Sequence, residues 1–366
     1  ALPICNTSGS YNIAEGFCAL YNNTTGENNI GIGSSTLRSN QTGYGNVGVG
    51  ARSLCSNTTG VLNVALGARN LVCNTTGGYN ISLGYKSLYS NTTGKYSIAI
   101  GKEALFSNAT GYPNIAIGKK ALHSNTDGFY NIAVGGYALF NNTSGFHNIG
   151  IGGGSLFSNT TGKCNIALGG DSLRYNTTGY YNLAIGENSL KSNTTGRRNT
   201  AIGRGTLQNN TEGNYSVAIG DAALQSNSGG NNNAIGYTAM KFNTTGYSNV
   251  ALGSGALQHN TTGNLNVAVG NYALSNNCAS CFNTAIGHNS LHGNTCGHDN
   301  VSIGFNSSSQ GCCGSQNVVL GSRAFDRGLC NNNVAVGFKS LSCSFFGERN
   351  VAVGSCALYC GEQSSY

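Results

Sequence analysis

Asparagine residues recur in this sequence in the setting that N-linked glycosylation requires. The acceptor motif is Asn-x-Ser/Thr, and a single copy is a weak signal because it arises often by chance. Here the motif forms one column of a repeat, at Asn6, Asn23, Asn40, Asn57, Asn74, Asn91, Asn108, Asn142, Asn159, Asn176, Asn193, Asn243 and Asn260. A column of motifs predicts exposed turns that carry covalent N-linked glycans along one edge of the molecule.

A purely structural interpretation of the same column stays open. Asn and Thr are good turn formers, and the glycine that follows them suits a position with positive φ. A turn alone does not require a hydroxyl two residues after each Asn, so we expect sugars as well as turns.

Cysteines are the second group of residues that could react, by forming disulfides, and 9 of the 14 lie from Cys278 onward. Equivalent residues on neighbouring coils of a stacked repeat lie about 4.8 Å apart, a Cα separation that a disulfide accepts. Three sets of cysteines occupy equivalent positions of the repeat: Cys343 with Cys360, Cys296 with Cys313 and Cys330, and Cys278 with Cys312. Cys55 and Cys73 lie on neighbouring coils but are one position out of register. We therefore predict disulfides among them, with Cys343–Cys360 clamping the last coils.

Catalytic and metal-binding residues are not indicated. His288, His292 and His298 lie near Cys296, but they occupy variable positions that a repeat places on surface turns, and no paired Cys-x-x-Cys clusters occur. The few acidic residues form no pair that recurs from coil to coil. We expect no enzymatic activity, no metal and no cofactor.

The element that positions all these residues is a repeat of 17 residues, marked by a reference glycine that closes each Asn-Ile-Ala-Ile-Gly-like block. Twenty-one such glycines follow one another at steps of 17, with two steps of 16, from Gly16 to Gly354. The copies fill the chain, so we expect one continuous domain over 1–366, with a partial first coil at 1–16 and Cys-rich final coils at 278–366.

Inside each copy the residue types alternate. Asn stands four residues before the glycine in 19 copies, Ile, Val or Leu stand three and one before it in nearly all, and a small residue lies between them. Alternation with a period of two indicates a half-buried strand, and we expect its large residues in the core. A Leu four residues after the glycine predicts a second short strand.

Seventeen residues are too few for a strand and a helix, but enough for two short strands and two turns. The sequence therefore predicts an all-β fold, a parallel β-solenoid or β-roll of about 21 coils. We expect the Asn residues before the strand, Asn80 and Asn300 included, to stack into side-chain amide ladders.

Composition narrows the function. Only 8% of residues are charged, and the formal net charge of +7 comes from scattered Lys and Arg, which argues against nucleic-acid binding. No apolar stretch approaches the length of a membrane-spanning helix. Fourteen cysteines, and an opening Ala1-Leu2-Pro3 that fits a processed N-terminus, lead us to expect a secreted protein on a cell or virion surface.

The Asn-x-Ala-Ile-Gly block resembles the head repeats of trimeric autotransporter adhesins, and the fuller NTTG-x-x-N-I-A-I-G-x-x-A-L pattern is similar to repeats of tail-fibre and surface-fibre proteins. This resemblance covers essentially the whole chain. It implies a parallel β-roll, extracellular attachment and often trimerisation. The cysteines and glycosylation motifs depart from that pattern.

Three functions compete on this basis. The first is a structural glycoprotein of an extracellular fibre, in which incomplete terminal coils add head to tail into a homopolymer. Cys5, Cys18, Cys356 and Cys360 would lock that joint. The second is a trimeric adhesin or viral fibre that binds a surface receptor, with the small-residue column as the contact between chains. The third is an ice-binding solenoid, suggested by the repeated Thr.

Overall fold

The computed structural model describes residues 5–328, 330–342 and 347–359, and these residues form β-strands and turns but no helix. No segment of this described part is therefore a helix that could cross a membrane. By its internal contacts the chain divides into two compact units, Ala1–Tyr181 and Asn182–Tyr366. Each unit is a stack of coils and is described by itself.

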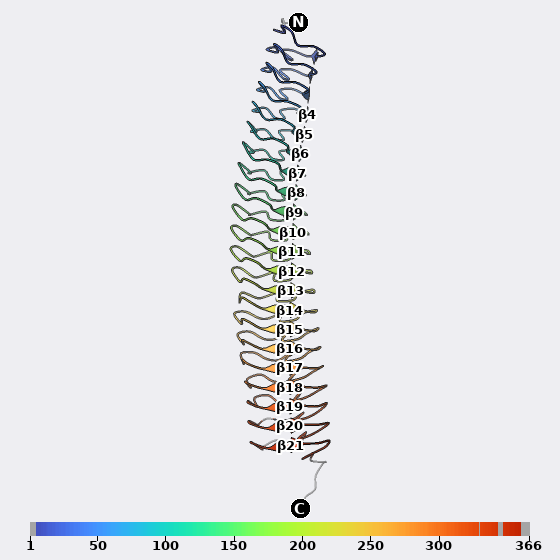
Figure 1. The fold of residues 1–366 in the computed structure, drawn as a ribbon, viewed down its shortest axis with the longest axis vertical. Helices are drawn as coiled ribbons and strands as arrows, with labels where there is room; N and C mark the ends of the chain where they lie inside the picture. Colours follow the sequence, from blue (N-terminus) through green and yellow to red (C-terminus); the bar gives the residue numbers. More distant parts are fainter. Residues whose placement is uncertain (1–4, 329, 343–346, 360–366) are drawn as a thin grey trace, which may run out of the picture. The chain divides into compact units, whose positions relative to one another are not determined.

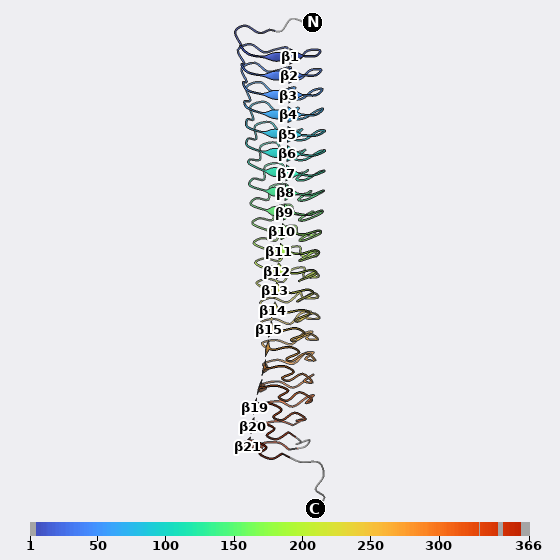
Figure 2. The ribbon, with the colours of Figure 1, turned by 90° about the vertical axis from the view of Figure 1, so that its right-hand side faces the viewer.

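The first unit contains one short strand per coil, each three residues long. These strands are β1 (Ile13–Glu15), β2 (Ile30–Ile32), β3 (Val47–Val49), β4 (Val64–Leu66), β5 (Ile81–Leu83), β6 (Ile98–Ile100), β7 (Ile115–Ile117), β8 (Ile132–Val134), β9 (Ile149–Ile151) and β10 (Ile166–Leu168). Figures 1 and 2 show them following one another along one side of this unit.

The second unit repeats the same design. Its strands are β11 (Leu183–Ile185), β12 (Thr200–Ile202), β13 (Val217–Ile219), β14 (Asn233–Ile235), β15 (Val250–Leu252), β16 (Val267–Val269), β17 (Thr284–Ile286), β18 (Val301–Ile303), β19 (Val318–Leu320), β20 (Val334–Val336) and β21 (Val351–Val353).

Within each unit, every strand pairs in parallel with the strand of the next coil. Ile98 lies opposite Ile115, a separation of 17 residues, while Val217 lies opposite Asn233 where the repeat is one residue shorter. If the strand of a short coil paired one residue out of register, its inward and outward side chains would change places. The short coils keep the register because the missing residue is taken from a turn. The parallel β-solenoid with a 17-residue repeat is confirmed.

The expectation of two strands per coil is wrong. The second strand was placed around the Leu that follows each reference glycine, but Leu105 has φ of 49° and Glu103 has φ of 58°. A residue in this left-handed conformation cannot continue an extended strand. Leu105 and its equivalents instead lie in a tight turn, and one three-residue strand per coil remains.

The reference glycine allows successive coils to approach each other closely. Gly101 has φ of 130°, and a Cβ added to it would lie 2.6 Å from the carbonyl oxygen of Gly118 on the next coil. Only glycine tolerates both that backbone conformation and that contact. This explains why the reference position holds glycine in every copy.

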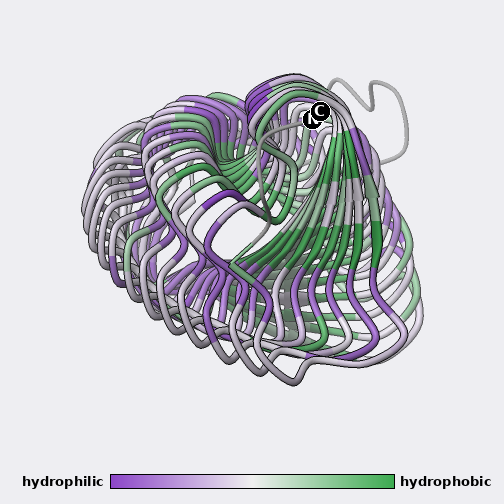
Figure 3. Ribbon diagram, turned by 90° about the horizontal axis from the view of Figure 1, so that it is seen from above, coloured by the Kyte–Doolittle hydropathy of each residue, from purple (hydrophilic) through white to green (hydrophobic). Residues whose placement is uncertain are grey.

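The core is built from small strand residues and turn leucines, which reverses the orientation expected from the sequence. The middle residue of each strand from β2 to β21 is buried, as Ala99 is, while Ile98 and Ile100 on either side of it are partly exposed. Leu105, expected in the core, is fully buried. The interior is narrow: a Cβ built on Gly31, a strand middle residue, would lie 3.4 Å from Leu20 Cγ. Val319, with Phe325 as the turn residue of its coil, is the largest buried middle residue. Figure 3 shows that hydrophobic segments gather into bands along the coils.

Candidate functional site

The asparagines of the predicted glycosylation column lie inside the coil. Asn57 is completely buried, and its Nδ2 donates hydrogen bonds to Asn40 Oδ1 at 2.8 Å and to the Gly60 carbonyl at 3.0 Å. Asn74 repeats this arrangement on the next coil, with bonds to Asn57 and Gly77. Both hydrogens of each amide group are therefore engaged away from solvent.

This geometry opposes the prediction that the column carries sugars. An N-linked glycan replaces one hydrogen on Nδ2 and needs space in solvent, whereas the column side chains from Asn23 to Asn260 are at most 1% exposed. A buried amide that loses a hydrogen bond also carries the full cost of desolvation. Asn6 differs because it is exposed, although its Nδ2 donates to the Gly9 carbonyl at 2.8 Å.

The threonines of the same turn have two different environments. Thr58 Oγ1 donates to the carbonyl oxygen of Thr75 on the next coil at 3.1 Å, so it fastens neighbouring turns together. Thr59, the hydroxyl residue of the glycosylation motif of Asn57, is exposed. The structure explains the Asn, the first Thr and the Gly of this turn, but it gives no reason for the second Thr.

The second asparagine column, just before each strand, forms the predicted amide ladder. Asn63 Nδ2 donates to Asn46 Oδ1 at 3.0 Å and to the Gly77 carbonyl at 2.9 Å, and its backbone N–H donates to the same Asn46 oxygen. Asn80 and Asn300 are buried members of this column. The ladder is interrupted at Ser97, whose shorter side chain accepts only the backbone N–H of Asn114.

One of the cysteine columns forms a disulfide. Cys296 is bonded to Cys313, 17 residues further on, with a Cα–Cα distance of 4.8 Å. The parallel register produces this pairing, because it places the two residues directly above one another. Cys330 belongs to the same column, but Cys313 is already bonded to Cys296.

The other predicted disulfides stay predictions. Cys343 and Cys360 lie outside the described residues. Cys55 and Cys73 are thiols in the structure, and burial, followed by the proximity of Cys55, raises the pKa of Cys73. Their offset by one place in the repeat matches the absence of a bond between them.

The histidines considered as metal ligands point to separate partners. His288 stacks on Phe305, His292 lies edge-on to Tyr272, and His298 Nδ1 lies 2.8 Å from Asp299 Oδ2. Across residues 5–328, 330–342 and 347–359, no three His, Cys, Asp or Glu side chains gather as metal ligands would.

The feature that sequence analysis missed is an apolar surface on the strands, which we define as the outward apolar face: the first and third residues of each strand. In the first unit it is uninterrupted from β2 to β10, where every one of these residues is Ile, Val or Leu. Ile117 is 38% exposed and Ile151 is 42% exposed. In the second unit it is broken by Thr200, Asn233 and Thr284.

The signal for this face was present in the sequence, but its direction was not. Alternation identifies residues that share a side of a strand, and the expectation that large residues face inward is the usual one. The nine coils of the face in the first unit extend on the order of 40 Å at about 4.8 Å per coil. Contiguous apolar surface of this extent is typical of surfaces that contact another molecule.

No known family model matches this chain, and no curated protein matches it either. The structure itself defines the class: a parallel β-solenoid repeat protein with internal asparagine ladders and an outward apolar face.

Proposed function

We propose that this chain is a structural subunit of an extracellular fibre, in which copies pack side by side through the outward apolar face of the first unit. The observation that carries the proposal is the unbroken Ile, Val and Leu surface of β2 to β10. Removing such surface from water is favourable at roughly 25 cal/mol per Å². Nothing polar in that stretch of face would be left without a partner.

A second copy of the same chain is the partner that fits this surface. The face repeats once per coil, so an identical chain presents the same rungs at the same spacing and can match them along the whole length. A self-complementary contact of this kind closes into a dimer by a two-fold rotation. Absence of charge from the face also favours an apolar partner over a charged one.

This arrangement replaces the contact first expected for a trimer. The small-residue column is buried inside the coil, as Ala99 and Ala116 show, so it cannot touch another chain. Head-to-tail growth through the terminal coils is compatible with side-by-side packing and stays a proposal, since 1–4 and 360–366 lie outside the described residues. Glycans are not needed by either contact.

The test is the mass of the protein in solution, measured by light scattering after size-exclusion chromatography. We expect the natural chain to run as an assembly of two or more copies. The double variant Ile100→Lys with Ile117→Lys should run as a monomer, because two charges would be buried in the contact. A monomeric natural chain, or an unchanged variant, would refute side-by-side packing.

The matched control is Thr93→Lys with Thr110→Lys. These threonines are exposed in the turns of the same two regions of the stack, so the change adds equal charge away from the strands. We expect the control to keep the mass of the natural assembly.

Ice binding is the second candidate, and one observation favours it: Thr59 and its equivalents Thr76 and Thr93 form an exposed file along the turns. The neighbouring Thr58 hydroxyl is occupied by its bond to Thr75, which leaves a single file instead of a flat double one. Thermal hysteresis of the purified protein distinguishes this function from the first.

A further inference from the structure

A run of stacked rings occupies the position five residues after the reference glycine in the first unit. We define the aromatic ladder as Tyr89, Phe106, His123, Phe140 and Phe157, whose neighbouring ring centroids lie 5.0–5.2 Å apart. The guanidinium carbon of Arg174 lies 5.0 Å from the Phe157 centroid and ends the run. The ring faces cover one another, so the ladder presents mainly ring edges to solvent.

Cations flank this ladder. Lys86 Nζ lies 5.9 Å from the Tyr89 ring centroid, Lys120 Nζ lies 5.9 Å from that of Phe140, and Lys119 Nζ lies 5.5 Å from that of Tyr137. Cations held over aromatic rings keep their charge and remain partly hydrated. The surface beside the ladder is therefore both aromatic and positively charged.

Two carboxylates offset only part of that charge. Glu103 lies 3.5 Å from Lys120 Nζ, and Asp171 accepts a hydrogen bond from Arg174. Beyond these two ion pairs, the surface carries three further cations: Lys86, Lys102 and Lys119. A row of positive groups repeating with the coils suits a linear anion that runs along the stack.

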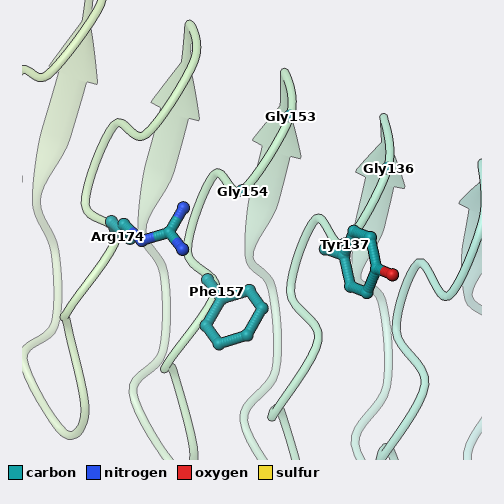
Figure 4. A pocket seen from close by; sticks show the side chains of 6 residues that line it. All are labelled: Gly136, Tyr137, Gly153, Gly154, Phe157 and Arg174. Atoms are coloured by element: carbon teal, nitrogen blue, oxygen red, sulfur yellow. The ribbon is translucent and has the colours of Figure 1, made fainter.

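A hollow of about 420 Å³ opens at the Arg174 end of the ladder, lined by Gly136, Tyr137, Gly153, Gly154, Phe157 and Arg174. Figure 4 shows Tyr137, Phe157 and Arg174 arriving from three successive coils, with the glycines between them. A Cβ added to Gly136 or Gly153 would meet no atom within 4 Å. The hollow therefore exists because side chains are missing from positions that carry Lys102 and Lys119 on earlier coils.

One aromatic surface in this hollow is open to a ligand. Gly154 follows Tyr137 in the same column of the repeat, so the next coil stacks no ring face to face on Tyr137. The ring of Phe157, from that next coil, is tilted by 42° to the Tyr137 ring with the centroids 6.4 Å apart. Arg174 fills part of the room above Gly154, since its NH1 lies 2.6 Å from where a Cβ would stand. Its guanidinium carries five N–H donors, and both Asp171 and Tyr175 hydrogen-bond to this side chain.

We propose that the hollow and the adjacent cations bind an acidic oligosaccharide. One sugar ring packs against Tyr137 and Phe157, its carboxylate or sulfate accepts hydrogen bonds from Arg174, and the following acidic sugars extend past Lys119 and Lys102. The two tilted rings of Tyr137 and Phe157 line the hollow together and suit contact with one sugar. Single-stranded nucleic acid needs a series of uncovered rings for successive bases, which the mutually stacked ladder does not offer.

The ligand class follows from the donors present. Pockets of this volume are within the range that holds small ligands, and a guanidinium pairs with carboxylate or sulfate through charge-assisted hydrogen bonds. This site lies on the turns and the outward apolar face lies on the strands, so the inference goes beyond the proposed assembly. Loss of one would leave the other measurable.

The experiment is a calorimetric titration of the full chain at low ionic strength with tetragalacturonic acid. Its methyl ester, the same tetramer without charge, serves as the neutral probe. We expect the acid to bind at least about tenfold more tightly than the ester, since the ester loses the charge-assisted hydrogen bond to Arg174. Equal binding of the two probes, or no measurable binding of the acid, would overturn the proposal.

Two variants locate the site. Gly153→Phe fills the hollow, and Phe305 and Phe338 already occupy the equivalent position on other coils, so the coil accepts this side chain. Arg174→Gln removes the charge. Each should weaken binding of the acid by at least about tenfold. Retention of full affinity in Gly153→Phe would overturn the assignment to this hollow.

Ala51→Phe is the matched control, because it places the same side chain at the same position on a distant coil of the unit. We expect its affinity to equal that of the natural chain. A thymidine tetranucleotide forms the final arm of the titration. Tighter binding of that probe than of the sugar acid would favour nucleic acid and refute the saccharide assignment.

Discussion

Asn57 donates a hydrogen bond from Nδ2 to the side-chain oxygen of Asn40, 17 residues earlier, over a distance of 2.8 Å. The same contact recurs from coil to coil within each unit and links side chains along the stack. Because each amide serves as donor to one neighbour and acceptor for the next, the ladder depends on every member carrying both groups. An apolar core this thin relies on such axial bonds for much of its cohesion.

Replacement of Asn57 by Asp should destabilise the coils around it by about 2–4 kcal/mol. The carboxylate removes the donor to Asn40 and Gly60 and places a charge at a buried position. Hydrogen exchange of the neighbouring backbone amides measures this locally. Thr59→Asp adds the same charge at an exposed position of the turn and should leave exchange nearly unchanged; equal effects of the two variants would contradict the ladder's role.

Folding and N-linked glycosylation should exclude each other at the buried column. In protein expressed through a secretory pathway, we expect the folded, protease-resistant fraction to have bare side chains at Asn57, Asn74 and their buried equivalents, because their Nδ2 atoms are enclosed. N-glycosidase treatment in heavy-oxygen water, followed by peptide mass analysis, marks every modified asparagine. A marked Asn57 in the folded fraction would show that the coil can open this position.

Glycine at Arg52 should stabilise the protein by about 0.5–1 kcal/mol. Arg52 has φ of 59°, and other coils already carry glycine at this place, as Gly154 and Gly205 show. Glycine adopts the left-handed conformation without the steric cost that a side chain incurs, which outweighs the entropy it adds to the unfolded chain. Ala51→Gly, one residue earlier and outside the positive-φ set, should destabilise. Thermal unfolding of the two variants gives the comparison, and a shift of the same sign in both would contradict this explanation.

Acid should weaken the aromatic ladder through His123. Burial, followed by the nearby charge of Lys120, lowers the pKa of His123, although Glu103 partly opposes this. As pH falls below the ordinary value of about 6.5, the unfolded chain binds a proton before the folded chain does, so stability declines until the folded pKa is passed. At neutral pH this loss is absent.

His123→Phe tests that sign. A phenyl ring continues the stack between Phe106 and Phe140, whose centroids lie 5.1 Å and 5.0 Å from the histidine ring, and it cannot be protonated. Thermal midpoints at pH 5 and pH 7.5 should differ less in the variant than in the natural chain. An identical pH dependence would exclude His123 as the responsible group.

The sequence alone determined the period of the repeat, the parallel register of the strands and the residue types that stack on one another from coil to coil. A repeat of 17 residues is too short for a strand and a helix, which favours a β-solenoid. Such a repeat brings equivalent residues of neighbouring coils together, which is why the Asn63 ladder and a disulfide in the column of Cys296 and Cys313 could be anticipated. These predictions depend only on which residues are equivalent. They do not depend on the shape of the coil.

Tertiary structure decided which way each column faces. Alternation in Ile98-Ala99-Ile100 separates two sides of a strand but does not say which side is the interior. The left-handed turn at Leu105 brings that leucine inward, where it shares the narrow interior with the small residue Ala99, and the isoleucines face outward. The same closure draws Asn57 inside, where its amide bonds to neighbours instead of reaching solvent. The direction in which a side chain points, into the coil or out to solvent, is set only when the coil closes, because it depends on the volume that the turns leave inside.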